Sequence, residues 1–230
     1  MFKNALEGVK KIYYSAICSI ATIGLSLGSL LFQLLGIGGD SSFIVLIGGL
    51  FGGASLIVCL AGLIFEIIGC YESSKDKKVF MLALYSAIAA ILFTCLGVVF
   101  SKVAGVIFNA LGSISSLLVV FFIIRGLSQI LTELDEIEMV KKGNKVLLLF
   151  LIMCAASLVI ELVVGIIEIL GAKLTLTTLL SIGSGVISLA AAILFMLYVK
   201  ESLTLIDLSS FKAHKEEVID VEVKETEENK

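Results

Sequence analysis

Four charged residues lie inside or at the ends of long apolar stretches of this sequence: Glu66, Glu161, Glu168 and Arg125. A charged side chain is costly at membrane depth. Such residues therefore face the interior of a helix bundle, pair with an opposite charge, or mark a path for ions or protons. The chemistry that they suggest is the binding and release of a cation or a proton.

Glu161 and Glu168 are seven residues apart, which is two helical turns, so one helix face carries both carboxyls. Lys173 lies near Glu168, but no cation matches the depth of Glu161, which therefore has no obvious partner in the sequence. The pair is a candidate ion or proton site. A carboxyl that only hydrogen-bonds to a neighbouring helix, or faces a water-filled crevice without transport, is the structural alternative.

Glu66 belongs to a stripe of small residues. Its members recur at steps of four and three, so they share one helix face: Gly48, Gly52, Ser55, Cys59, Gly62 and Gly69. Small residues at this spacing let two helix backbones approach closely in lipid, and we expect a helix-packing face. Arg125 is expected at a similar depth, so we predict that Glu66 and Arg125 form an intramembrane pair.

Other chemistries find no support in the sequence. The single histidine, His214, lies near the carboxyl end, so neither a Ser-His dyad nor an HExxH zinc site can be built in a span. The five cysteines form no CxxC pair. Gly38-Gly39-Asp40 resembles an aspartyl-protease motif only faintly, since no span holds a second Asp. We therefore expect no enzyme, no metal site and no cofactor.

The elements that must hold these residues are membrane-spanning helices. Of the 230 residues, 59% are hydrophobic and 16% are charged. The mean hydropathy is +1.12, so lipid has to be the solvent of most of the chain. Apolar stretches long enough to cross a bilayer predict six spans in an all-α bundle, with a tight turn at Ser101-Lys102. The predicted spans are 12–36, 43–71, 79–100, 103–124, 146–170 and 175–199.

The distribution of cations predicts that both termini are cytoplasmic. Lys and Arg accumulate in cytoplasmic connections. Here only Lys102 and Lys173 fall in the alternate connections, and the other cations lie at the amino end, in the second and fourth connections, and after the sixth span. Six spans arranged as three hairpins fit this pattern. The equal spacing of Lys11, Lys78 and Lys145 fits either a repeated hairpin or three separate basic anchors.

Two further segments complete the predicted organisation. Apolar residues step by three and four between 126 and 145, opposite a run of carboxylates, which predicts an amphipathic cytoplasmic helix. Residues 1–211 would then form the six-span transmembrane domain. Residues 212–230 are rich in carboxylates, and we expect an acidic, disordered cytoplasmic tail.

Two functions from different classes stay open. The first hypothesis is a non-enzymatic scaffold or accessory subunit of a membrane complex, with a protein partner at its cytoplasmic face. The alternative is a small ion- or proton-coupled transporter or channel that uses intramembrane carboxylates. The formal net charge of −3 argues against a nucleic-acid partner, and the excess of Lys over Arg favours a bacterial cell membrane.

Overall fold

The protein is an all-α, multi-pass membrane protein. The computed structural model describes the backbone of residues 2–36, 42–100, 102–169 and 174–228, together with most side chains up to residue 211. Six helices follow one another: α1 (Lys3–Gly36), α2 (Ser42–Ser74), α3 (Val79–Val99), α4 (Lys102–Glu133), α5 (Ile137–Ile169) and α6 (Leu174–Glu228). Each contains a stretch long and apolar enough to cross a membrane, which confirms the prediction of six long apolar helices as candidate spans. Their outer side chains contact lipid.

The long helices follow from two properties of the chain. In lipid no water is available for the peptide groups, so each span satisfies them internally as a helix. The sequence contains no proline, and proline in a helix interior removes a backbone hydrogen bond and kinks the helix. The break predicted at Ser101-Lys102 lies between α3 and α4. Phe100 ends α3 in an extended conformation, while Ser101 lies outside the described residues.

The structure differs from the prediction of one amphipathic helix over 126–145. This segment is divided between the end of α4 and the start of α5. At the turn Asp135 has a φ of 59°, and the backbone N–H of Glu136 donates to the carbonyl oxygen of Leu131 at 2.9 Å, which is the bond that ends many helices. The apolar periodicity continues across the turn because Leu127 on α4 and Met139 on α5 are both buried in the same core.

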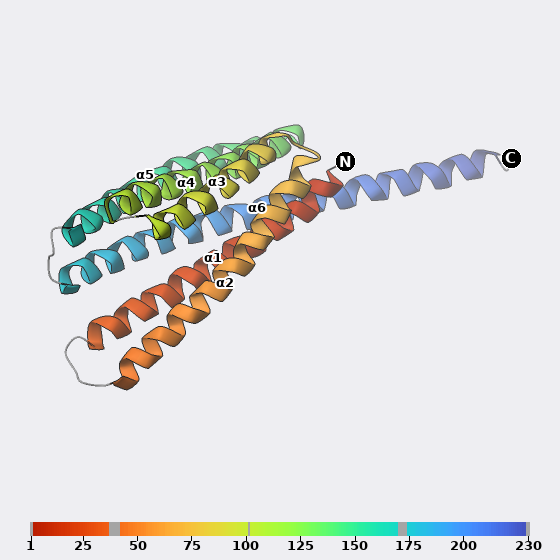
Figure 1. Ribbon diagram of the computed structural model, residues 1–230. Helices are drawn as coiled ribbons and strands as arrows, with labels where there is room; N and C mark the ends of the chain where they lie inside the picture. Colours follow the sequence, from red (N-terminus) through yellow and green to blue (C-terminus); the bar gives the residue numbers. More distant parts are fainter. Residues whose placement is uncertain (1, 37–41, 101, 170–173, 229–230) are drawn as a thin grey trace.

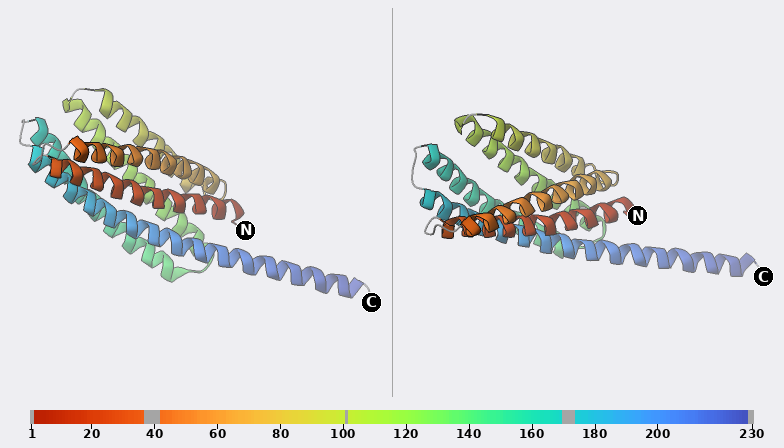
Figure 2. Two further views of the ribbon diagram at one scale, coloured as in Figure 1. Left: turned by 90° about the horizontal axis from the view of Figure 1, so that it is seen from below. Right: turned by 60° about the horizontal axis from the view of Figure 1, so that its bottom comes forward.

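The six helices form a ring of three hairpins. Each helix packs against its neighbour in the chain, and the contact between α1 and α6 closes the ring. We call the basic end the end that holds the amino terminus, the connections 75–78 and 134–136, and residues 200–211 of α6. The opposite end, where α1, α3 and α5 finish, is the tip end. The hairpins lie close together at the basic end and diverge toward the tip end (Figures 1 and 2).

The packed core lies near the basic end. Phe80 on α3 is 0% exposed and Tyr198 on α6 is 1% exposed. The large side chains buried with them come from three of the helices: Val9, Ile12, Ile123, Ile124, Leu127, Ile130, Leu131, Val199 and Ile206. At the tip end, by contrast, Phe43 is 67% exposed and Val98 is 82% exposed. The helices are therefore held together mainly at one end.

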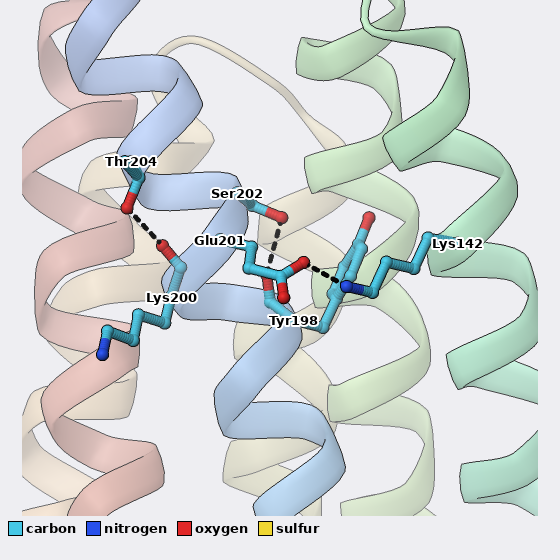
Figure 3. A network of polar contacts seen from close by, with 6 residues as sticks. All are labelled: Lys142, Tyr198, Lys200, Glu201, Ser202 and Thr204. Carbon is cyan, nitrogen blue, oxygen red and sulfur yellow. Dashed lines mark hydrogen bonds and ion pairs between the residues drawn. The ribbon is translucent and has the colours of Figure 1, made fainter.

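Ion pairs join neighbouring elements at the same basic end. The Lys11 Nζ atom of α1 lies 2.5 Å from the Glu72 Oε1 atom of α2. Lys77 pairs with Glu133 of α4, and Lys142 of α5 pairs with Glu201 of α6 (Figure 3). In addition, Asp76 accepts a hydrogen bond of 2.6 Å from the backbone N–H of Ala5. The connections and helix ends at this end of the bundle are thus fixed by charge as well as by packing.

Helix α6 continues well beyond the bundle. It runs without a break to Glu228 and projects away from the other helices past the basic end (Figure 1). Side chains after Phe211 lie outside the described residues. The disordered state in solution that the composition of 212–230 suggests therefore stays a prediction.

Candidate functional site

The small-residue stripe of α2 faces α1. A Cβ atom on Gly62 would lie 3.0 Å from the Cβ atom of Cys18, and one on Gly48 would lie 3.4 Å from that of Phe32. The approach is closest at Gly69, where a Cβ atom would lie 2.7 Å from the carbonyl oxygen of Gly8.

The other members of the stripe continue this packing face. Ser55 shares a hydrogen bond of 2.8 Å with Ser26 of α1, Gly52 lies beside Ser29, and Cys59 is partly buried. The hairpin of α3 and α4 uses a similar close approach. A Cβ atom on Gly112 would lie 3.0 Å from the hydroxyl oxygen of Thr94.

Glu66 lies on this stripe but does not pair with Arg125. Its Oε2 atom accepts a hydrogen bond of 3.4 Å from the hydroxyl of Ser15 on α1. Arg125 lies on α4 with an exposed side chain, and among the described residues no ion pair joins the two. The two side chains lie on helices that do not adjoin in the ring, so matched depth does not bring them together.

Glu161 lies on α5 beside a group of hydroxyls. Its Oε2 atom accepts a hydrogen bond of 3.3 Å from Ser113 of α4. One turn before it, the Oγ atom of Ser157 lies 2.6 Å from that of Ser184 and 3.0 Å from that of Ser188, both on α6. Glu168 is two turns further along α5, but its side chain lies outside the described residues. That Glu168 and Glu161 form one ion or proton site therefore stays a prediction.

A cavity of about 750 Å³ lies between the hairpins and brings Glu66 and Glu161 together. All six helices contribute to its wall. Besides the two carboxyls, its polar lining consists of hydroxyls and one carboxamide: Ser15, Ser19, Thr94, Asn109, Ser113, Ser116, Ser157 and Ser188. None of the described residues that line it is Lys, Arg or His. The cavity is thus an electronegative space within the membrane domain.

A second cavity of about 330 Å³ adjoins the first. Glu161 and Ser188 line both, so the side chain of Glu161 lies at their junction. The second cavity lies between α1, α5 and α6 and is bordered by further hydroxyls, among them Thr22 and Ser181. Glu161 is therefore accessible from two sides.

The two carboxyls lie at different depths. Ser15, the partner of Glu66, is one turn beyond Lys11 in α1. At the helical rise per residue, this places Glu66 about 6 Å from that lysine along the axis. Glu161 follows Lys145 by sixteen residues in α5. The same rise makes that separation about 24 Å. Because both lysines belong to the basic end, Glu66 lies near the packed core and Glu161 nearer the tip end.

This arrangement can bind a cation. Each carboxyl, with hydroxyl oxygens beside it, can hold a positive charge that lipid would exclude. Among the residues that the structure describes, no group of three or more His, Cys, Asp or Glu side chains converges to hold a metal ion. The carboxyls also lie too far apart along the helices to share one proton.

The common cavity was not anticipated from the sequence. The carboxyls lie on the second and fifth spans, and no spacing along the chain relates them. Hydroxyls within otherwise apolar helices could have indicated the cavity from the sequence. Those that line it include Ser15, Ser19, Ser113, Ser116 and Ser157.

The chain was compared with models of protein families, with characterised proteins and with solved structures, and none of them matches.

Proposed function

We propose that this protein is a non-enzymatic transporter or channel for small cations, with Glu161 as the principal binding carboxyl and Glu66 as the second. The observation that carries this proposal is the cavity in which both carboxyls face hydroxyls and, among the described residues, no basic side chain. Sequence reasoning places a scaffold first. The shared cavity favours transport over a scaffold role, because a scaffold does not require two carboxyls around an open space in the membrane.

The cation would move between the carboxyls along the cavity. It would enter from the tip end, where the hairpins diverge (Figure 2). It would reach Glu161 first and then Glu66, beside Ser15. Between Glu66 and the basic end, the apolar core blocks passage, and its residues Ile12 and Ile123 are both 1% exposed. Passage to the basic end therefore requires the hairpins to move apart there, in the manner of bundles that rock against one another.

We further propose that the basic end is cytoplasmic and that the membrane is a bacterial cell membrane. Fifteen of the seventeen cations belong to the amino end, the connections at the basic end and the segment after the sixth span, which supports this orientation. Reporter fusions after residues 40, 75, 102, 140, 173 and 230 test it. A cytoplasmic signal at 40, 102 or 173 would overturn it.

Flux through reconstituted protein tests the transport proposal. Vesicles that hold a dye for the ion under test receive a gradient of protons, Na⁺, K⁺ or an organic ammonium ion. The wild type is expected to carry at least one of these ions faster than empty vesicles do. Glu161→Gln keeps the size of the side chain but removes its charge, and we expect it to abolish the flux.

Glu138→Gln is the matched control, since Glu138 lies on the same helix but is exposed outside the cavity. Equal flux in the wild type and in Glu161→Gln would contradict the proposal, as would the absence of flux for every ion tested.

A scaffold role remains the second candidate because of the projecting part of α6. This part extends past the bundle (Figure 1), and from His214 onward the sequence is rich in carboxylates. Such a segment can recruit a basic protein partner at the cytoplasmic face. A stoichiometric partner that crosslinks to the wild type and is lost when residues 212–230 are deleted would favour this role over transport.

A further inference from the structure

From the size and the wall of the cavity we infer that its ligand is an organic cation, an ammonium ion with an apolar body, rather than a bare metal ion. This inference rests on the proposed function and names its substrate class.

The first reason is volume. Metal ions are held by six or more oxygens at short range, about 2.0 to 2.6 Å for the common divalent ions, which requires ligands that converge on a point. Here the carboxyls of Glu66 and Glu161 lie at different depths of a cavity of about 750 Å³. That volume falls within the range of about 300 to 1,000 Å³ that pockets for small organic molecules occupy. A bare ion would leave most of the space to water.

The second reason is the composition of the wall. Hydroxyls and carboxyls alternate with aliphatic side chains such as Ile23, Leu63 and Val106. An ion with a full water shell gains nothing from these aliphatic groups. A ligand with an apolar body gains by removing both surfaces from water, while its charged group stays beside a carboxyl.

The third reason is an aromatic pair in the part of the cavity nearest the packed core. Phe150 of α5 and Phe195 of α6 both line it, and their ring centroids lie 6.2 Å apart. Aromatic faces attract ammonium groups and pack against apolar ones. Because no described lining residue is basic, the cavity repels no cation. The charge, the aliphatic wall and the aromatic pair thus select the same class of ligand.

Binding of ethidium, a fluorescent organic cation, to the purified protein in lipid nanodiscs tests the inference. We expect saturable binding that benzyltrimethylammonium displaces. KCl at the same concentration and benzyl alcohol, which matches the aromatic body without the charge, should not displace ethidium. Glu161→Gln and Glu66→Gln should each weaken binding about tenfold. Glu161→Asp retains the carboxyl and should bind ethidium more tightly than Glu161→Gln does, which separates loss of the site from loss of the fold.

A second pair of variants tests the volume. Ala110→Leu fills part of the cavity, whereas Ala156→Leu places the same side chain on an exposed face of α5 outside it. Only Ala110→Leu should weaken the binding of ethidium. Glu138→Gln serves as the charge control. Absence of saturable binding, equal affinity in the glutamine variants, or equal displacement by benzyl alcohol would each overturn the inference.

The two proposals fail in different ways. A flux of Na⁺ or K⁺ that depends on Glu161, in a protein that does not bind ethidium, would overturn the substrate class and retain transport. Saturable binding that depends on the carboxyls, in a protein that carries neither ethidium nor inorganic ions across vesicles, would retain the site and overturn transport.

Discussion

The two ends of the bundle are built from the same helices and the same kinds of residue, yet they differ in how much of each helix meets another. On α2, an added Cβ atom on Gly69 at the basic end would lie 2.7 Å from the carbonyl oxygen of Gly8, whereas one on Gly48 toward the tip end would lie 3.4 Å from the Cβ atom of Phe32. Phe80 is fully buried at the basic end, and Phe43 is mostly exposed at the tip end. Within lipid, the hydrophobic effect does not drive helices together at either end, because lipid tails are as apolar as the side chains. Close packing is what distinguishes the two ends.

The basic end thus provides most of the packing that stabilises the bundle, and the proposed binding carboxyl Glu161 lies nearer the tip end. At the basic end the core and the ion pairs hold the hairpins together. Toward the tip end the hairpins separate (Figure 2). The cavity that Glu161 lines lies between them. Substitutions of one residue type should therefore have unequal effects at the two ends.

The largest contrast is expected between Phe80→Ala and Phe43→Ala. Removing the ring of Phe80 leaves a void in the core, where its edge contacts the backbone position of Gly126. We expect a loss of about 3 kcal/mol, the lower end of the range for Phe→Ala, because in lipid only the packing part of the cost remains. Phe43→Ala should change stability by less than about 0.5 kcal/mol. Unfolding by SDS titration in mixed micelles measures both, and equal losses would remove the contrast.

A smaller contrast is expected between two glycines of α2. Gly69→Ala would place a methyl group 2.7 Å from the carbonyl oxygen of Gly8 and 2.8 Å from the Cγ1 atom of Ile12, which forces α1 and α2 apart. The expected cost is about 1 to 3 kcal/mol. Gly53→Ala meets no neighbour and gains helix propensity, so it should be neutral or slightly stabilising. Thermal unfolding in detergent compares the two. A loss at Gly53 as large as that at Gly69 would show that the stripe does not set the helix spacing.

The smallest effect is expected from the ion pair between Lys142 and Glu201. Both side chains are about half exposed, so water and salt screen the attraction. A double-mutant cycle with Lys142→Gln and Glu201→Gln should give a coupling of about 0.3 kcal/mol that vanishes in high salt. A coupling above about 1 kcal/mol would mean that charge, rather than the apolar core, holds the basic end together.

The sequence predicts the spans better than the contacts between them. Apolar stretches of sufficient length can only be helices in lipid, so each predicted span corresponds to one helix. The turn at 134–136 was missed because its left-handed position holds Asp135 instead of the glycine that usually marks such a helix end. The pairing of Glu66 with Arg125 failed for another reason. Sequence position gives the depth of a residue in the membrane, but not which helices stand beside it.

The site was predicted in part for the same reason. Glu161 and Glu66 stand out individually because a carboxyl in an apolar stretch is rare. That they face one cavity depends on the ring of three hairpins, which the spacing of residues along a single chain does not specify. Likewise, the hydroxyls of Ser113 and Ser157 can be assigned to the site only when the arrangement of α4, α5 and α6 around Glu161 is known.

The contact between α1 and α6 also has a consequence for the order in which the protein assembles. The α1–α2 and α3–α4 hairpins can each pair as soon as the ribosome has delivered them to the membrane. The contact of Leu27 with Gly185, by contrast, joins segments far apart in the chain, and it must wait until α6 has been inserted. Until then the hydroxyls of α6 are missing from the surroundings of Glu161, and one side of its helix is open to lipid. During insertion, a carboxyl of the proposed binding site must therefore be shielded by something other than the finished bundle.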